Sequence, residues 1–351
     1  MRLQIKKILP RGWEYKEDNE YIKIWYKNEK GRHPEPIKVK NEIEISRELG
    51  VLLGFWIGDG TKRRFVLTNN EPILIKYLYD SIRNIFSVDE DNLSLRISIP
   101  PNFKRKEIQF FDSVNEQFHE ISDIKTKGFY ANRNSPILHL RINSIVFIKL
   151  FKQIYAHISQ NVSKESEIWD GYLTGIIAAE GHMDLRRNYN TLSRIAIAQV
   201  DKDNREEICK ALEKKGITYT TSEGYITIFG KKNFDIISKR ELYSLHPKKK
   251  EQFIKGYSRI KQAQYSTDEV EHLLLDNMKE PIRVSKLAKK FGRCRQTIRE
   301  HLLLKGNSLY KRGLIEVRGK ERGARGSFYG NLWGLTEKGF NHIQSTEVME
   351  K

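Results

Sequence analysis

Two carboxylates stand at equivalent places in two segments of similar sequence. Asp59 ends the apolar run 52–58, Glu180 ends the run 173–179, and a glycine follows each acid. An acidic side chain at the C-terminal end of an apolar helix faces the negative end of the helix dipole and gains no stability there. Two such carboxylates brought close together raise each other's pKa unless a cation neutralises them. The pattern is typical of a site for a divalent cation that prefers oxygen ligands, such as Mg²⁺.

Small residues give the two predicted helices a way to meet. Gly54 and Gly58 are four residues apart, as are Gly175 and Ala179. Residues four apart lie on one face of a helix, so each helix has a stripe where a second backbone can come close. If the helices cross on these stripes, the two carboxylates arrive together at one end of the pair.

Both segments resemble the LAGLIDADG motif of homing endonucleases, with Asp59 and Glu180 at the position of that family's metal-binding acid. The resemblance covers residues 46–262. It implies an α+β fold in which a duplicated αββαββα core has a pseudo-twofold axis and two saddle-shaped sheets over the DNA major groove. It also implies a Mg²⁺- or Mn²⁺-dependent endonuclease that leaves a staggered double-strand break in double-stranded DNA. Backbone carbonyls near Gly58 and Ala179 are possible further metal ligands.

The family usually places a basic residue near each active centre, late in the repeat. In the second repeat Lys231 follows the predicted strand 226–229, and we predict that it stabilises the transition state or positions water. The equivalent stretch of the first repeat, 141–144, has no lysine. Lys125 or Lys127 could reach that centre from the preceding segment.

Two other basic features lie near the second motif. His182 directly follows it, and we interpret this histidine as a surface or DNA-contacting residue. The lysine run 248–250 follows a proline, and we predict a solvated helix start that touches phosphate.

Strict alternation of apolar and polar residues predicts strands with one solvent face. Residues 93–99 and 138–143 alternate in this way, and a further strand is predicted around 194–200. Their polar faces carry groups that suit phosphates and base edges, although an ordinary solvated sheet has the same pattern. We predict DNA contacts from four of these side chains: Arg96, His139, Arg141 and Arg194.

The segment 266–345 has the pattern of a winged helix-turn-helix. A capping-box start is followed by predicted helices at 284–291 and 293–303, and then by two strands around a Gly- and Arg-rich stretch. Residues 281–330 hold 14 Lys and Arg against 3 Glu, a surplus of +11. Such concentrated charge favours DNA over a protein partner. The predicted DNA-binding residues are Arg293, Arg295, Arg299, Arg318, Lys320, Arg322 and Arg325.

Composition limits the class of protein. The net charge of +18 and the pI of about 9.6 indicate an anionic polymer as partner. The two cysteines, Cys209 and Cys294, cannot form a disulfide framework or the usual structural zinc site. No apolar stretch is long enough for a membrane span, and the N-terminus is too charged for a signal peptide. We therefore expect a soluble, cytoplasmic, nucleoid-associated protein without a membrane partner. The resemblance to the two-repeat type of the family implies a monomer, and the sequence shows no protein partner.

The expected organisation has four parts: a β-rich extension over 1–45, a first repeat over 46–160, a second repeat over 166–262 and the winged helix over 266–345. Intron homing is the expected role, with the gene inside an intron or free-standing. Two alternatives remain open: a non-catalytic DNA-binding transcriptional regulator built on the same fold, and an RNA-splicing maturase.

Overall fold

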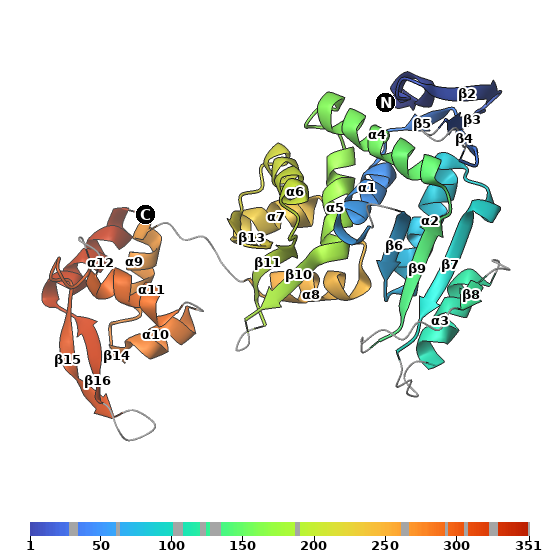
Figure 1. The fold of residues 1–351 in the computed structure, drawn as a ribbon. Helices are drawn as coiled ribbons and strands as arrows, with labels where there is room; N and C mark the ends of the chain where they lie inside the picture. The colour runs from blue at the N-terminus through green and yellow to red at the C-terminus, as the bar shows by residue number, and fades with distance from the viewer. Residues whose placement is uncertain are drawn as a thin grey trace. The chain divides into compact units, whose positions relative to one another are not determined.

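The computed structural model divides the chain into two compact units, Met1–Ile260 and Lys261–Lys351 (Figure 1). The described residues are 1–27, 34–60, 64–100, 108–119, 124–126, 135–186, 190–260, 267–291, 294–304, 308–322 and 329–349. Among them, no helix is both long enough and apolar enough to cross a lipid bilayer.

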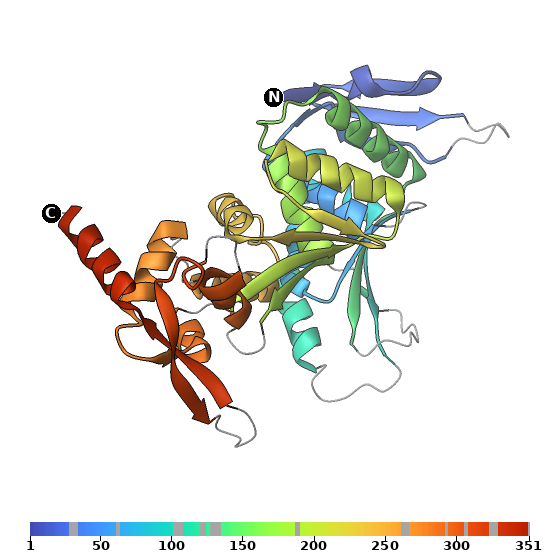
Figure 2. The ribbon, with the colours of Figure 1, turned by 90° about the vertical axis from the view of Figure 1, so that its left-hand side faces the viewer.

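A pair of buried helices forms the centre of the first unit. Helix α1 (Arg47–Asp59) is buried from Leu49 to Ile57, and helix α5 (Ile168–Glu180) from Ile168 to Ala178. A helix that is apolar on every side is stable only when other elements surround it, which explains the central position of both. Figures 1 and 2 show α1 and α5 side by side, with the two larger sheets on either side of them.

The second repeat follows the predicted αββαββα order. Its strands form an antiparallel sheet in the order β10-β11-β13-β12. After α5 come β10 (Gly181–Leu185), β11 (Leu192–Ala198), α6 (Lys202–Lys214), β12 (Thr220–Ser222), β13 (Tyr225–Phe229) and α7 (Lys231–Lys239). A further helix, α8 (Pro247–Ser258), then packs against β10 and β11.

The first repeat departs from that order. Only residues 60–64 join Asp59 to its first strand, whereas 181–191 join Glu180 to β11 and include β10. The first repeat therefore continues from its motif helix to the strand that corresponds to β11. Its elements are α1, β6 (Phe65–Asn69), α2 (Pro72–Phe86), β7 (Leu93–Ser98), α3 (Ile108–Phe118), β8 (Ile124–Thr126), β9 (Ile137–Ile142) and α4 (Ile145–Asn161).

An insertion accounts for the rest of the difference. The sheet order is β6-β9-β7-β8, and β8 pairs parallel to β7. Helix α3, predicted from the sequence over 107–120, packs on α2, where the Phe118 and Tyr79 rings meet edge-on at 6.3 Å. The insertion therefore extends one edge of the sheet and covers part of α2.

The alternating strands have the predicted faces. Leu95 and Ile97 on β7 and Leu140 on β9 are buried, while Arg96 and Arg141 between them are only half-buried. The polar faces of β7 and β9 therefore point away from the core.

The N-terminal extension packs into the first unit. Strands β1 (Arg2–Gln4) and β5 (Glu42–Glu44) pair, and a second sheet has the order β2-β3-β4 (Trp13–Asp18, Tyr21–Tyr26 and Ile37–Lys40). The predicted strand 21–26 is thus β3, with Ile22 and Ile24 fully buried. The Lys149 ammonium of α4 lies 3.9 Å from the centre of the Tyr26 ring, which joins the extension to the first repeat.

The second unit has its own hydrophobic core. Leu287, Ile298, Leu302 and Trp333 are buried within it, and its three-stranded sheet has the order β14-β16-β15. Apart from short 3-10 and π-helical segments, the elements of this unit are, in chain order, α9 (Thr267–Asp276), β14 (Ile282–Arg283), α10 (Val284–Lys290), α11 (Arg295–Arg299), β15 (Ile315–Arg322), β16 (Tyr329–Leu335) and α12 (Glu337–Met349).

Candidate active site

The two motif acids meet where α1 and α5 end. Asp59 is the last residue of α1, and Glu180 is the last residue of α5. The helix ends touch so closely that a Cβ added to Gly58 would lie 2.6 Å from the Ala179 Cβ and 3.2 Å from the Glu180 Cγ. The side chains of Glu180 and Asp59 share a hydrogen bond. The crossing expected from the small-residue stripes therefore brings both acids to one place.

The pKa of Glu180 is raised to near neutrality. Burial is the main cause that raises its pKa to about 7, and the charge of Asp59 raises it further, while the Lys249 ammonium opposes both. Two carboxylates this close cannot both ionise without cost unless a cation joins them. The pair thus has the electrostatic character that a bound divalent cation would relieve.

Lys249 of α8 is the positively charged residue that acts on the pKa of Glu180. Its Nζ donates to the carbonyls of Ile177, Ala178 and Ala179 at 3.1, 2.6 and 2.9 Å. These carbonyls belong to the last turn of α5, where a positive charge complements the helix dipole. Burial lowers the pKa of Lys249 to about 8, while Asp59 and Glu180 act in the opposite direction.

The prediction of a solvated helix start at 248–250 is therefore wrong for Lys249. The lysine points inward because α8 packs beside β10, next to the end of α5. Its neighbour Lys248 forms an ion pair of 2.5 Å with Glu71 of the first repeat. No sequence signal separates an inward lysine from its two neighbours in a run of three.

The C-terminal end of α1 is capped by neutral amide side chains, whereas that of α5 is capped by a lysine. The Ile57 carbonyl accepts hydrogen bonds from the side-chain amides of Gln199 and Asn204 at 3.3 and 3.4 Å. Both residues come from the second repeat, so each motif helix is capped by side chains of that repeat. Sequence reasoning missed these amides, because polar residues beside a helix start are usually local caps.

Lys231 and His182, two other residues predicted near the site, pair with acids other than Asp59 and Glu180. Lys231 starts α7 and forms an ion pair of 3.1 Å with Asp235, one turn along the same helix. It is not among the groups that set the pKa of Glu180, and its catalytic role stays a prediction. The His182 side chain is 73% exposed, with Nε2 3.0 Å from an Asp184 carboxylate oxygen.

The donor set suits a hard divalent cation. Asp59 and Glu180 offer carboxylate oxygens, the ligands preferred by Mg²⁺ and Mn²⁺. No cluster of three or more His, Cys, Asp or Glu residues occurs in the described part of the chain, so the other ligands would be backbone oxygens and water. Of the two expected carbonyls, that of Ala179 already accepts a hydrogen bond from Lys249.

The predicted DNA-contacting residues of the repeats lie on the outward sheet faces. His139 is held within its sheet, because its two ring nitrogens lie 3.2 and 2.7 Å from the hydroxyls of Thr68 and Ser98. Arg141 has a lowered pKa, mainly through burial and then through the neighbouring charges of Arg96 and Arg64. Arg194 donates through Nε to Asp184 across the β10–β11 pair.

In the second unit some of the predicted DNA-binding residues are exposed, one is held by contacts within the protein, and others lie outside the described residues. Arg295 and Arg299 are exposed on α11, and Lys320 is exposed on β15. Arg318 donates to the Leu335 carbonyl at 2.6 Å and pairs with Glu316 at 2.8 Å. Arg293 and Arg325 lie outside the described residues, as does the side chain of Arg322.

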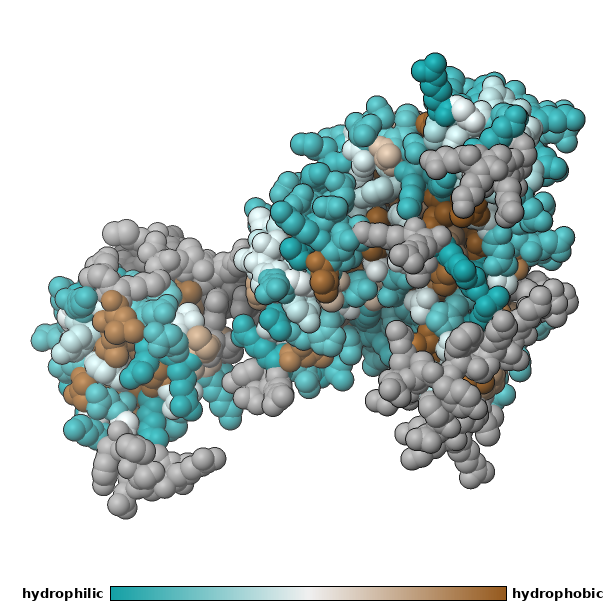
Figure 3. Space-filling model, viewed as in Figure 1, coloured by the Kyte–Doolittle hydropathy of each residue, from teal (hydrophilic) through white to brown (hydrophobic). Residues whose placement is uncertain are grey.

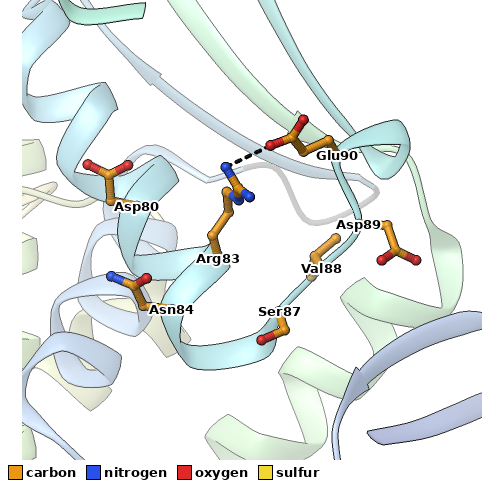
Figure 4. Close-up of a pocket in the computed structure, with 7 residues that line it drawn as sticks. All are labelled: Asp80, Arg83, Asn84, Ser87, Val88, Asp89 and Glu90. Atoms are coloured by element: carbon orange, nitrogen blue, oxygen red, sulfur yellow. Dashed lines mark ion pairs between the residues drawn. The ribbon is translucent and has the colours of Figure 1, made fainter. Parts of the chain in front are cut away.

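A separate pocket of about 670 Å³ lies at the C-terminal end of α2. Figure 4 shows Arg83 pointing to Glu90, with which it forms an ion pair of 2.7 Å. The other lining residues are Asp80, Asn84, Ser87, Val88 and Asp89. None of them is a candidate catalytic or DNA-binding residue. Elsewhere the face drawn in Figure 3 is largely hydrophilic, with hydrophobic side chains in small patches.

Comparison with known proteins agrees with the motif assignment. Residues 168–248, from the start of α5 into the first turn of α8, match the LAGLIDADG-like domain family. The chain thus carries a LAGLIDADG-like domain in its second repeat, and the resemblance predicted from the motifs is confirmed there. No curated protein sequence matches the chain.

Solved structures that match the chain include I-DmoI in complex with DNA and Mn, at 16% sequence identity and a TM-score of 0.32. That match covers 57% of this chain and 99% of the other. The N-terminal LAGLIDADG domain of DUF199/WhiA matches at 13% identity and a TM-score of 0.34, covering 58% of this chain and 86% of the other.

Proposed function

We propose that the protein is a site-specific homing endonuclease that makes metal-dependent, staggered double-strand breaks in DNA. The observation that supports this most directly is the hydrogen-bonded pair of Asp59 and Glu180 at the joined ends of the motif helices. Stability does not require two acids at the negative ends of two helices. Both motif helices belong to one chain, so a monomer would hold both acids.

In this proposal the carboxylates of Asp59 and Glu180 would hold the ion, and Lys249 positions the end of α5 that carries Glu180. Bound Mg²⁺ or Mn²⁺ would make water a better nucleophile at neutral pH and offset charge on the leaving oxygen. Glu180 would lose its proton to solvent on binding the ion. Lys249 keeps the last turn of α5 in place through its hydrogen bonds to the carbonyls there. Its ammonium would also add positive charge near the acid pair, where a phosphate would bind.

The second unit supplies additional DNA affinity in this proposal. Its order of elements, with two short helices before a strand pair, is the order expected for a winged helix. Arg295 and Arg299 of α11 would enter the major groove, and Lys320 would contact phosphate from the strand pair.

The test is cleavage of a randomised duplex DNA library with Mg²⁺, with Mn²⁺ and with chelator. The proposal expects discrete double-strand cuts that need the metal and disappear in Asp59→Asn and Glu180→Gln. Glu48→Gln, at an exposed acid in the first turn of α1, is the matched control and should cut normally. Cutting that survives both site substitutions, or its absence with every divalent metal, would refute the nuclease.

A DNA-binding regulator is the second candidate, and one observation favours it. Lys249 already provides a positive charge beside the acid pair, which a protein that never binds a metal would also need. Sequence-specific protection of DNA without any cleavage would support that reading. Binding to an intron transcript in preference to duplex DNA would instead favour a maturase.

A further inference from the structure

The outward face of the first-repeat sheet carries two arginines for which the described residues offer no carboxylate partner. Arg96 lies on β7 and Arg141 on the neighbouring strand β9, and strands β6, β7 and β9 contain no acidic residue. The Nε of Arg96 is buried and has no hydrogen-bond partner among the described residues. The buried Nε cannot reach an outside acceptor, but a guanidinium without an anionic partner can donate from its terminal nitrogens to an acceptor from outside the protein.

The corresponding face of the second repeat is different in kind. Its arginine, Arg194, donates a hydrogen bond to Asp184, which lies directly opposite it on β10. The most exposed side chains of β13 are the aromatic Tyr225 and Phe229, which are 51% and 44% exposed. Ala198 of β11 lies beside Tyr225, so the part of this face formed by β11 and β13 offers apolar contact, while His182 and Asp184 lie on β10.

The two faces match different base edges in the major groove. Arginine forms a paired hydrogen bond to the O6 and N7 of guanine, whereas apolar side chains contact the thymine methyl group. Resting on the proposed function, we infer that the two half-sites of the DNA target differ: Arg96 and Arg141 read guanines beneath the first repeat, and Tyr225 and Phe229 contact thymines beneath the second.

The strand register also sets the expected spacing. Arg141 is directly opposite Ser94, so Arg96 is its diagonal neighbour. Diagonal neighbours are roughly 7–8 Å apart, close to two base steps of about 3.4 Å. Tyr225 and Phe229 are four residues apart on one strand, roughly 13 Å, or about four base steps. The guanines are therefore separated by one base pair and the thymines by three.

The experiment selects bound duplexes from a randomised library in chelator, so that cleavage does not remove them. The full-length protein should enrich guanine at two positions of one half-site and thymine at two positions of the other. Arg96→Lys and Arg141→Lys keep the charge but lose the paired hydrogen bond, and each should reduce the preference for its guanine about tenfold. Phe229→Ser should relax the opposite half-site only.

Arg83→Lys is the matched control, because Arg83 lies on α2 and pairs with Glu90. Thermal unfolding of each variant checks that the fold is kept. Unchanged guanine preference in both lysine variants would mean that the arginines contact only phosphate and would overturn the inference. So would a preference that changes equally in both half-sites.

Addition of Mg²⁺ to the selected DNA separates this inference from the nuclease proposal. Selected duplexes that are bound with the expected preferences but stay uncut refute the nuclease and leave the base reading intact. Duplexes that are cut without these preferences do the reverse.

Discussion

The α-carbon of Gly54 faces the backbone carbonyl of Tyr172 with no room for a side chain between them. A Cβ added to Gly54 would lie 1.9 Å from that oxygen, and one added to Gly175 would lie 2.3 Å from the carbonyl of Val51. Backbone meets backbone at both of these positions in the crossing of α1 and α5. This close approach is what allows their two terminal acids to share a hydrogen bond.

Gly54→Ala should therefore be strongly destabilising. The added methyl group would overlap backbone atoms, which cannot move aside as the end of a flexible side chain can. We expect a loss of about 3 kcal/mol or more in the free energy of unfolding, measured by denaturant titration. Gly319→Ala is the control, because its Cβ would meet only the Leu332 Cδ1 at 3.7 Å, and it should change stability by less than about 0.5 kcal/mol. A Gly54→Ala protein as stable as that control would refute the packing argument.

The sequence predicted this helix pair because both determinants of the crossing are local. Small residues four apart in each motif indicate a backbone contact, and the acid that follows them marks its end. The structure extends the stripe by one turn: Gly50 and Gly171 make the same kind of close contact, at 2.1 and 2.0 Å for an added Cβ. Alternation likewise predicted β7 and β9, because burial on one face leaves a period of two.

The remaining parts of the site depend on long-range packing. Lys249, Gln199 and Asn204 reach the helix ends from segments distant in sequence from the carbonyls that they cap. Nothing in their local sequence records which way they point. No counterpart of β10 occurs in the described part of the first repeat, and the short connection 60–64 between Asp59 and β6 is the sequence feature that indicates this.

Lys249→Met should damage both stability and cleavage. The substitution keeps a long apolar stem but removes the ammonium from three carbonyls, which leaves buried acceptors without their donor. We expect a loss of about 1–3 kcal/mol in unfolding free energy and a loss of cleavage larger than the fraction unfolded explains. Lys250→Met, at the exposed next position, is the matched control and should behave as the wild type. Equal behaviour of the two variants would contradict the inward role of Lys249.

Glu180→Gln should make the metal-free protein more stable above neutral pH while abolishing cleavage. Folding raises the pKa of Glu180 to about 7, so ionising it costs stability as the pH rises from its ordinary value of 4.5 through 7. Glutamine cannot ionise and avoids that cost. We expect a gain on the order of 1–3 kcal/mol at about pH 8 and little difference near pH 4. Added Mg²⁺ should narrow the gap, because the ion stabilises only the wild-type pair. A variant less stable than the wild type at both pH values would contradict this prediction.

His246 should make the protein sensitive to mild acid. Burial lowers its pKa to about 4, the charges of Lys249 and Lys248 lower it further, and Glu71 opposes them. The folded protein therefore holds the ring neutral, while the unfolded chain binds a proton below about pH 6.5. The stabilisation is fully present above pH 6.5 and is lost as the pH falls towards 4. Its size is on the order of 1–3 kcal/mol.

The substitution that isolates this effect is His246→Asn, because asparagine does not titrate and suits the N-cap position that His246 occupies at the start of α8. Unfolding free energies measured between about pH 7 and pH 4.5 should fall less steeply in the variant than in the wild type. His119→Asn, at an exposed histidine directly after α3, corrects for the loss of a histidine as such and should follow the wild-type curve. If His246→Asn follows that curve as well, the acid sensitivity of the protein has another source.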